Sequence, residues 1–534
     1  MSKLKINNKP APLEQHYREV GYWNDDTLYQ LLAECARSTP DKPAIMTEES
    51  QLTYAEWHDR VLRLAGALQE LGVDKGDVVA VQLPNIPEFP IAFLAIAALG
   101  AVTQTLHMPY RSAELHALLS HSGAKCFIGL SQFKEDAPAQ EGVRRQADMA
   151  TLEHVIAVGQ PVAGTHAFSR LLQHTPAAHL PTLSGDDAFL LLYTSGTTGN
   201  PKGVPIKYCW FMSNARLTVS DWEITGQDSI LSVAPYTHLY GLWTLILTLY
   251  TGATNALLPA FTPPELVQCI AKLNPTGIFA GPAHIAAMLH TGLWDKFDAV
   301  GIRFICQAGS IVPDHIAQAI DEKLVNGCVM QCFGMSELQA GCYTRPSDPP
   351  EVRIHTSGTP PAGMELKIVD SDGHDVPAGE EGQLLFRGMA VFTGYLNNAA
   401  ATRVAFTQDG WFITGDTARL TPTGHLKITG RLKDIINRGG IKYHPMEVED
   451  VVSQRDGVEM CAVIAYPDAV LGERACIFIQ KREDATITLE DITAALDTAG
   501  LAKYKWPERL AFVDQMPLTP TRKIIRSELA KLLS

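Results

Sequence analysis

Residues 193–203 read YTSGTTGNPKG and follow directly on the apolar run 188–192, AFLLL. The apolar run predicts a buried strand, and the small residues after it predict a loop. In that loop, hydroxyl side chains can donate to phosphate oxygens, glycines let backbone N–H groups approach a ligand closely, and one lysine adds positive charge. The stretch therefore predicts a strand that delivers a polyphosphate-binding loop, with the candidate residues Thr194, Ser195, Gly196, Thr197, Thr198, Gly199 and Lys202.

This loop differs from the phosphate loop of P-loop NTPases. That motif places lysine directly after its second glycine, whereas Asn200 and Pro201 separate Gly199 from Lys202 here. A P-loop NTPase is therefore disfavoured. A surface loop without chemical function is the alternative for a random Ser/Thr/Gly cluster. An ordered string of such residues after a buried-type strand favours the phosphate-binding interpretation.

Further segments extend the pattern over nearly the whole chain. They are LTYAEW (52–57), residues 93–109, APYTHLYG (234–241), FGMSE (333–337), TGD (414–416), GRLKDIINRGG (430–440) and PLTPTRKIIR (517–526). Together with the loop, and in the same order, they resemble the adenylate-forming ligase superfamily, which includes acyl-CoA and aryl-CoA synthetases, adenylation domains of peptide synthetases, and luciferases. Collinear agreement over so many segments is far more specific than the loop alone.

Composition restricts the protein to a few broad classes. A chain of 534 residues exceeds the size at which one hydrophobic core stops growing, so at least two domains are expected. A net charge of −14 argues against a general nucleic-acid or anionic-membrane surface. No apolar run reaches the about 20 residues of a membrane span, and MSKLKINNKP lacks the apolar core of a secretory signal, so we expect a cytoplasmic protein. The ten scattered cysteines form no C-x-x-C pair, which predicts reduced core thiols and no structural metal.

Alternating strand-like and helical patterns predict an α/β fold. The runs 78–83, 91–99 and 125–130 are typical of βαβ units in parallel sheets. Short β-like runs at 365–369 and 382–387, separated by turns, predict a small antiparallel barrel or sheet. The last about 100 residues have the length of a separate α+β domain, with strands expected at 460–466, 475–480 and 510–513 and helices at 445–454 and 489–499.

The predicted domains are therefore residues 1–430 and 431–534. We expect the first to contain two parallel-type αβ subdomains and a small β-barrel. The resemblance places a hinge near Lys433. It implies that the small C-terminal domain is mobile and presents Lys523 for adenylation, then Gly439 and Gly440 for thioester formation with coenzyme A.

The resemblance implies that a carboxylate attacks the α-phosphorus of ATP and pyrophosphate leaves. Both reactants are anions, so catalysis is mainly positioning and charge neutralisation. Glu337 matches the glutamate that supports Mg²⁺, although an isolated glutamate would be more typical of an exposed turn. Asp416 and Arg431 match the ribose contacts. The remaining candidates for ATP binding are Gly309, Ser310, Phe333, Gly334, Met335 and Ser336, with Cys332 beside them.

Lys523 matches the superfamily's catalytic lysine, although composition alone would favour a surface lysine in a basic tail. The superfamily commonly has glycine just before this lysine, whereas the chain has Arg522. If the backbone needs a positive φ there, Arg522 is strained and adenylation is slowed.

His238 resembles a residue that gates the acyl pocket and changes posture between the half-reactions, and we expect it to act in catalysis. Its alternative is a structural histidine. The expected acyl pocket is largely apolar and comprises Tyr236, His238, Leu239, Trp243, Ile311 and Met335. No carboxylate is offered to an α-amino group, which disfavours an amino-acid-activating enzyme.

The leading hypothesis is an AMP-forming acid–thiol ligase that uses ATP, Mg²⁺ and coenzyme A to activate an aryl, cyclic or medium-chain acid. The first alternative is an aryl acid–AMP ligase that loads the pantetheine of a carrier protein. Such enzymes usually have asparagine where Leu239 stands. The second alternative is a nucleotide-binding pseudoenzyme, which only Arg522 supports. The sequence leaves the oligomeric state open, with a homodimer among the options.

Overall fold

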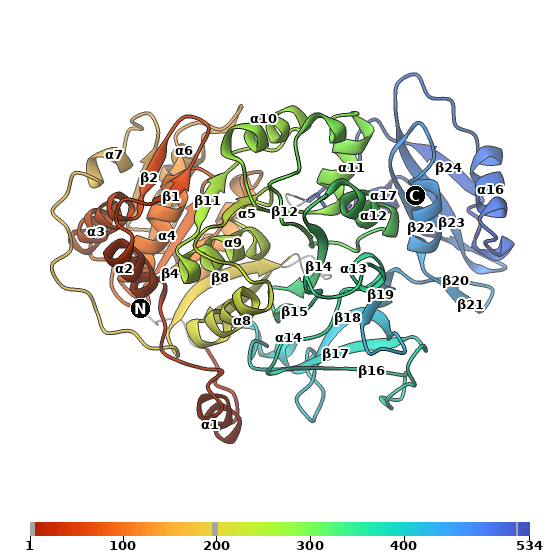
Figure 1. The fold of residues 1–534 in the computed structure, drawn as a ribbon, viewed down its shortest axis with the longest axis horizontal. Coiled ribbons are helices and arrows are strands. Elements are labelled where there is room, and N and C mark those ends of the chain that lie inside the picture. Colours follow the sequence, from red (N-terminus) through yellow and green to blue (C-terminus); the bar gives the residue numbers. More distant parts are fainter. Residues whose placement is uncertain (1–5, 195–200, 520–521, 534) are drawn as a thin grey trace.

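The computed structural model describes residues 6–194, 201–519 and 522–533. These residues form two large, mainly parallel sheets, a small antiparallel sheet and a C-terminal sheet (Figure 1). The C-terminal part lies to one side of the larger part (Figure 1). The α/β prediction with a separate C-terminal domain is confirmed.

The first sheet has seven strands in the order β7-β6-β5-β3-β4-β8-β9, all parallel except β9, which runs antiparallel to β8. Its runs of β-branched and aromatic residues are buried, as is typical of strands covered on both faces. The strands are β3 Val78–Gln82, β4 Val102–Thr105, β5 Cys126–Leu130, β6 His154–Val158, β7 His166–Ala167, β8 Ala188–Thr194 and β9 Lys202–Lys207.

The second sheet has eight strands in the order β15-β14-β13-β12-β10-β11-β1-β2, with β2 and β15 antiparallel to their neighbours. The strands are β1 Pro43–Met46, β2 Gln51–Thr53, β10 Ser229–Ser232, β11 Thr254–Leu257, β12 Gly277–Ala280, β13 Phe304–Gln307, β14 Cys328–Met335 and β15 Gln339–Tyr343.

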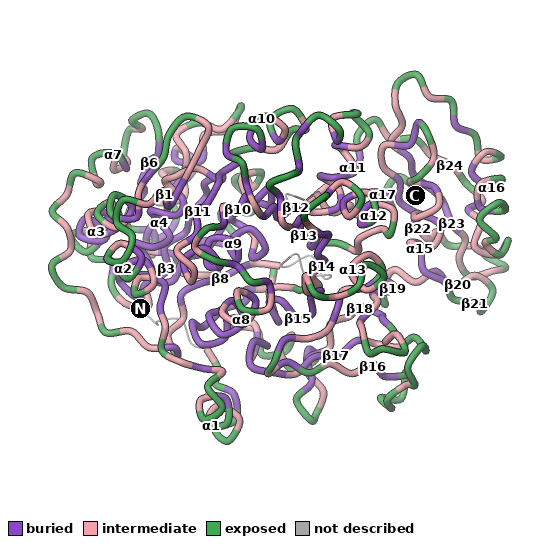
Figure 2. The backbone as a smooth tube through the Cα atoms, in the orientation of Figure 1, coloured by how far each residue is buried: buried purple, intermediate pink, exposed green. Residues whose placement is uncertain are grey.

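One hydrophobic core joins the two large sheets, and helices α4 and α9 lie within it. Both helices are apolar on all faces, which is typical of helices that are buried all round. Figure 2 shows buried backbone concentrated around α9, β8 and β3. The helices of this larger part are α1 Ala11–Glu19, α2 Leu28–Ser38, α3 Tyr54–Glu70, α4 Glu88–Ala98, α5 Ser112–Ser122, α6 Pro138–Asp148, α7 Phe168–Leu171, α8 Tyr208–Asp221, α9 Leu239–Thr251, α10 Pro263–Leu273, α11 Pro282–His290, α12 Asp314–Lys323, α13 Pro350–His355 and α14 Ala399–Val404.

The antiparallel region is an open sheet of four strands in the order β16-β17-β18-β19. Of the barrel or sheet expected here, the sheet is therefore observed. In the described residues, β19 pairs with β18 and does not return to β16, so the barrel does not close. The strands are β16 Met364–Val369, β17 Gly382–Gly388, β18 Phe412–Leu420 and β19 Leu426–Arg431.

The C-terminal sheet follows the order β21-β20-β23-β22, with β24 paired to β23. Two hydrophobic clusters of this part pack its strands against helices α15, α16 and α17. The elements are β20 Ile436–Arg438, β21 Ile441–Tyr443, α15 Pro445–Val452, β22 Val458–Asp468, β23 Gly472–Lys481, α16 Leu489–Thr498, β24 Arg509–Phe512 and α17 Arg526–Lys531.

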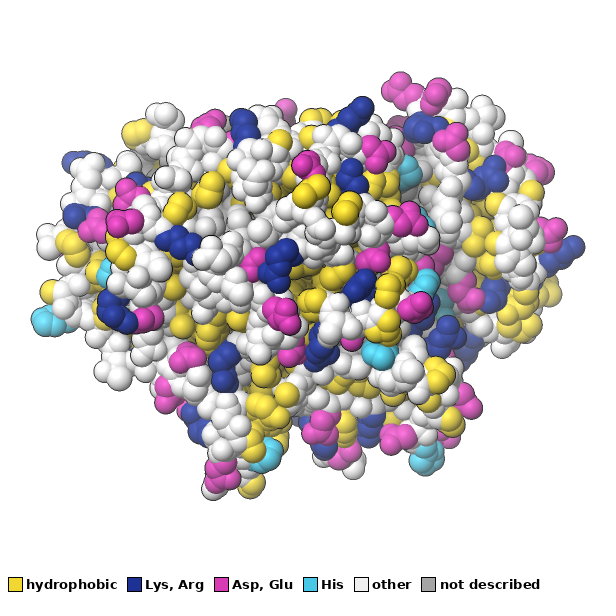
Figure 3. Space-filling model, in the orientation of Figure 1, with side chains coloured by type: hydrophobic (Ala, Val, Ile, Leu, Met, Phe, Trp, Pro, Cys, Tyr) yellow, Lys and Arg dark blue, Asp and Glu magenta, His cyan; other side chains and the backbone are white. Residues whose placement is uncertain are grey.

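The surface carries both signs of charge. Basic and acidic side chains are interspersed over the face shown in Figure 3. All ten cysteines are unpaired, and all except Cys332 are buried. Within the described ranges, no helix combines the length and the apolar character needed to cross a membrane.

Candidate active site

The ends of β8 and β9 hold the predicted phosphate loop. Thr194 ends β8 and is paired in register with Lys202, the first residue of β9. Lys202 Nζ lies over the ring of Tyr395, 4.9 Å from its centroid. The hairpin thus brings both ends of the loop together. The predicted loop residues Ser195, Gly196, Thr197, Thr198 and Gly199 lie outside the described residues.

Glu337 occupies the turn between β14 and β15 and is buried. The Tyr395 hydroxyl donates to its Oε1 at 3.0 Å. Burial raises the pKa of Glu337, and the hydrogen bond from Tyr395 and the charges of Lys202 and Arg431 oppose that rise. Among the described residues it makes no direct ion pair. A buried carboxylate of this kind suits a bound divalent cation, because oxygen ligands are what Mg²⁺ prefers.

Asp416 and Arg431 face each other across strands β18 and β19. Arg431 Nε lies 3.1 Å from Asp416 Oδ1. Asp416 is buried, which raises the pKa of its carboxyl, while the charges of Arg431 and Lys523 lower it. About half of the Arg431 side chain is exposed. A buried acceptor beside an exposed guanidinium can hold ribose hydroxyls while the cation faces a phosphate.

Lys523 comes from the C-terminal part, is half-buried and lies within electrostatic reach of these groups. Burial is the main reason that its pKa falls from 10.5 to about 8; Arg431 lowers it further, and Asp416 and Glu337 raise it. The turn that carries Lys523 is held by two hydrogen bonds, from Thr519 N to Lys523 O at 2.7 Å and from Lys523 N to Thr519 Oγ1 at 3.0 Å. The structure thus brings together the charges of Lys523, Asp416, Arg431 and Glu337.

Arg522 has a φ of +61°. The backbone therefore adopts the left-handed conformation that glycine would accept without strain, so the condition for strain at this position is met. For an L-residue other than glycine this conformation costs about 1 kcal/mol or more.

The residues predicted to bind adenine lie at the ends of two adjacent strands. Parallel β13 and β14 are paired through Gln307 and Gln331, so their carboxyl ends meet at one edge of the sheet. Such an edge is where ligands bind in open α/β sheets. Residues 309–310 follow β13, with Gly309 at φ +94° and Ser310 exposed, and residues 333–336 end β14 or follow it, with the Phe333 ring stacked on Phe386 at 5.8 Å.

His238 caps the N-terminus of α9, where its Nδ1 accepts from Tyr240 N at 3.2 Å. Its ring stacks on His107, with centroids 6.3 Å apart. Burial, with smaller effects of Lys523 and His107, lowers the pKa of His238 well below its ordinary value, so this imidazole is neutral. A neutral ring next to Lys523 can contact an acyl group without adding charge.

A small cavity of about 20 Å³ lies beside His238, with room for about one water molecule. Of the predicted acyl-pocket residues, His238 and Leu239 line it. Tyr236 and Trp243 are core residues, and Ile311 and Met335 are half-buried at the edge of the core. The cavity is lined by Thr105, His107, Tyr110, Leu192, Tyr193, Thr237, His238, Leu239 and Ser336.

The residues expected at the hinge and near coenzyme A lie on exposed connections. Lys433 belongs to a short 3-10 turn, residues 432–434, between β19 and β20. Gly439 and Gly440 form the β20–β21 turn with φ of +63° and +88°. Gly439 N donates to Leu471 O at 2.7 Å. These positive φ values explain the need for glycine at the turn.

Tyr395 and His107 are site residues that our sequence reasoning did not single out. Tyr395 bonds to Glu337 across 58 positions of sequence, and His107 meets His238 across the two large sheets. Neither contact has a local spacing signal. Segments that were identified by resemblance, 93–109 and 234–241, did contain the two histidines.

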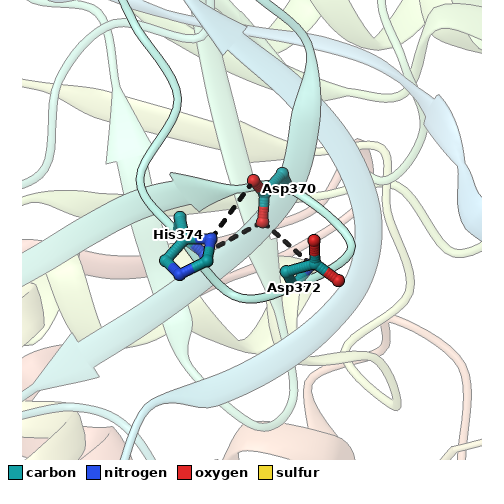
Figure 4. A group of neighbouring side chains, drawn as sticks. All are labelled: Asp370, Asp372 and His374. Carbon is teal, nitrogen blue, oxygen red and sulfur yellow. Dashed lines mark hydrogen bonds and ion pairs between the residues drawn. The ribbon is translucent and has the colours of Figure 1, made fainter.

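A cluster of metal-ligand types lies elsewhere, on the exposed turn after β16 (Figure 4). Asp370 Oδ1 accepts from the backbone N–H groups of Asp372 and His374, both at 2.9 Å. These bonds are those of an ordinary side-chain-stabilised turn. The cluster is therefore explained by local structure.

Comparison with known proteins identifies the class to which this fold and site belong. The family model described as AMP-binding enzyme matches residues 32–396, and the model described as AMP-binding enzyme C-terminal domain matches residues 447–523. The chain belongs to this family of adenylate-forming ligases.

The similar proteins include both CoA ligases and an aryl-AMP ligase. The chain is 30% identical to the medium-chain fatty-acid–CoA ligase of Escherichia coli over 96% of its own length and 92% of the relative's. It is 32% identical to the salicyl-AMP ligase / salicyl-S-ArCP synthetase of Mycobacterium tuberculosis, over 98% and 94%. The crystal structure of the anthranilate CoA ligase AuaEII in complex with anthranoyl-AMP matches with a TM-score of 0.87 at 26% identity, over 95% and 97%.

Proposed function

We propose that the protein is an ATP-dependent carboxylic acid:CoA ligase for an aryl, cyclic or medium-chain acid. The observation that supports this most is the position of the half-buried Lys523 near Asp416, Arg431 and Glu337, because it brings a cation from the C-terminal part to the proposed nucleotide site. The acid is first activated as an acyl adenylate. The thiol of coenzyme A then replaces AMP.

In the first half-reaction a carboxylate oxygen attacks the α-phosphorus of ATP, and the bond to the pyrophosphate oxygen breaks. Asp416 accepts from the ribose hydroxyls, and Arg431 lies beside it. Lys523 donates to the oxygens between the carboxylate and the α-phosphate, where negative charge concentrates. The phosphate loop, with Thr194 and Lys202 at its ends, holds the leaving pyrophosphate.

Glu337 would hold the magnesium ion, since it is a buried carboxylate without a direct counter-ion among the described residues. Bound magnesium supplies positive charge to the phosphates and orients them. Tyr395 fixes the carboxylate through its 3.0 Å hydrogen bond. Glu337 is thereby oriented before nucleotide binds.

In the second half-reaction the thiol sulfur attacks the acyl carbon, the thiol proton is released, and AMP leaves with the electron pair of the broken C–O bond. We propose domains 1–430 and 431–534 with the hinge at Lys433, so that rotation would replace Lys523 by the Gly439–Gly440 turn. The glycines there would allow a pantetheine arm to approach the backbone closely.

A carrier-protein thiol is the second candidate acceptor, and the salicyl-S-ArCP synthetase relative favours it. Leu239 favours coenzyme A. It lines the cavity beside His238, and its side chain offers no hydrogen bond to a ring hydroxyl.

The test is pyrophosphate release with ATP and magnesium over a panel of benzoates, cyclic acids and C4–C12 fatty acids, with and without coenzyme A. Continuous turnover only with coenzyme A supports the proposal. One stoichiometric burst that coenzyme A leaves unchanged indicates the carrier-protein acceptor. No release with any acid, together with ATP binding, indicates a nucleotide-binding protein without catalysis.

A further inference from the structure

Arg522 connects the turn that carries Lys523 to the larger part of the protein. Its guanidinium carbon lies 5.5 Å from the ring centroid of Phe261, in the segment between β11 and α10. Neighbouring residues of one turn therefore interact with two different parts of the large domain. Lys523 interacts with the Asp416 region, and Arg522 contacts Phe261.

A second aromatic ring packs against Phe261. The ring of His284, in the first turn of α11, meets it edge-on, with centroids 4.6 Å apart and planes at 75°. His284 is buried and bonded to Gly281 N through Nδ1 at 2.9 Å. Burial and the Arg522 charge lower the pKa of His284 to about 3. A neutral His284 supports the ring without repelling the guanidinium.

The Arg522 backbone is strained, so another contact must offset the free-energy cost of its conformation. Its φ of +61° is unfavourable for arginine, yet the turn keeps it, with Arg522 N donating to Thr519 O at 2.8 Å. Arg522 Nε is buried and has no hydrogen-bond partner among the described residues. Among the described residues, the aromatic face of Phe261 therefore provides the attractive contact for the Arg522 guanidinium.

We propose that Arg522 is a positioning residue that holds Lys523 in the adenylation site by packing its guanidinium on Phe261, backed by His284. The contact offsets the backbone strain at position 522, which a glycine there would not have. It exists only while the C-terminal domain is docked as seen here. Arg522 therefore acts on adenylation and leaves the second half-reaction unaffected, a consequence that rests on the proposed function.

The first measurement needs neither the acid nor the acceptor. Acetylation of Lys523 by acetic anhydride is followed by mass spectrometry in the full-length protein, since a docked Lys523 is half-buried and therefore partly protected. Arg522→Ala and Phe261→Leu are each expected to raise the acetylation rate about three- to tenfold. The double variant should be no faster than the faster single variant, because both changes remove the same contact.

Two further variants separate the side chain from the backbone. Arg522→Gly relieves the positive φ but loses the guanidinium, so its Lys523 should be more reactive than in the wild type and less than in Arg522→Ala. The matched control is Arg509→Ala, which removes a cation–ring contact of 4.3 Å to Tyr466 within the C-terminal domain. It should leave the acetylation rate unchanged.

Wild-type protection in Arg522→Ala, or additive effects in the double variant, would overturn the inference. ATP–pyrophosphate exchange supplies the functional measurement and should fall in parallel with protection, while thioester formation from supplied acyl adenylate stays constant. If ATP–pyrophosphate exchange is absent with every acid while the labelling pattern is as expected, the proposed function is refuted and the positioning role of Arg522 is retained.

Discussion

The ammonium group of Lys523 is expected to titrate near the working pH, so that kcat/KM for ATP falls above pH 8. Burial and Arg431 lower the pKa of this group from 10.5 to about 8. This displacement corresponds to about 3 kcal/mol. At pH 9 only about one Lys523 in eleven is charged, so kcat/KM should fall about tenfold between pH 7 and pH 9. At saturating ATP the phosphates raise this pKa again, and kcat should hold to higher pH.

Pyrophosphate release at low ATP concentration, from pH 6.5 to 9.5 at constant ionic strength, measures this titration. The control is Lys523→Arg, because arginine stays charged throughout the range. Its absolute rate should fall, but its kcat/KM should lose the decline near pH 8. A decline that persists in Lys523→Arg belongs to another group. That result, or a wild-type profile that is flat to pH 9.5, would refute the role of Lys523.

Four other changes test separate parts of the structure. Glu337→Gln should slow pyrophosphate release about 100-fold and raise the magnesium concentration needed for half-maximal rate, as measured by magnesium titration. Asp416→Ala should raise KM for ATP at least about tenfold in steady-state kinetics, since charged hydrogen bonds to the ribose are lost. Burial and acidic neighbours raise the pKa of Asp450 from 3.8 to about 7, so its favourable contribution is present at low pH and is lost as pH rises through 7. Asp450→Asn should therefore gain about 3 kcal/mol of unfolding free energy over the wild type between pH 5 and pH 8, by urea denaturation. Trp222→Ala should lose about 3–5 kcal/mol in the same assay with KM unchanged, because Trp222 is fully buried and donates to Thr344 O at 3.0 Å.

Local sequence patterns predicted the helices and strands in which apolar residues recur at a regular spacing or in one run. The strand expected at 460–466 is β22, and the helix expected at 489–499 is α16. The segment 91–99 covers the end of α4 and its C-cap Leu99 and has no polar face, so it belongs to a buried helix inside the core. Such elements carry their signal in consecutive residues, which is why sequence reasoning finds them.

Closure of a sheet depends on pairing between strands far apart in sequence, and no local pattern encodes it. β16 and β17 were recognisable as strands, but whether β19 would pair with β16 was not. The same limit applies to the site. Glu337, Asp416 and Lys523 were named through family resemblance rather than spacing, and Tyr395 was missed because its bond to Glu337 joins two irregular segments.

The charges at the site connect nucleotide binding to domain docking. Lys202, Arg431 and Lys523 supply positive charge around two buried carboxylates, Glu337 and Asp416, and Asp434 adds negative charge near Asp416. Burying charged Lys523 there is unfavourable, as its lowered pKa shows. ATP brings negative charge that is stabilised more in the docked state, and by linkage it must favour docking. Departure of pyrophosphate removes most of that negative charge. On the proposed function, the docked C-terminal domain would then be less stabilised by electrostatics, which would favour its movement before the second half-reaction.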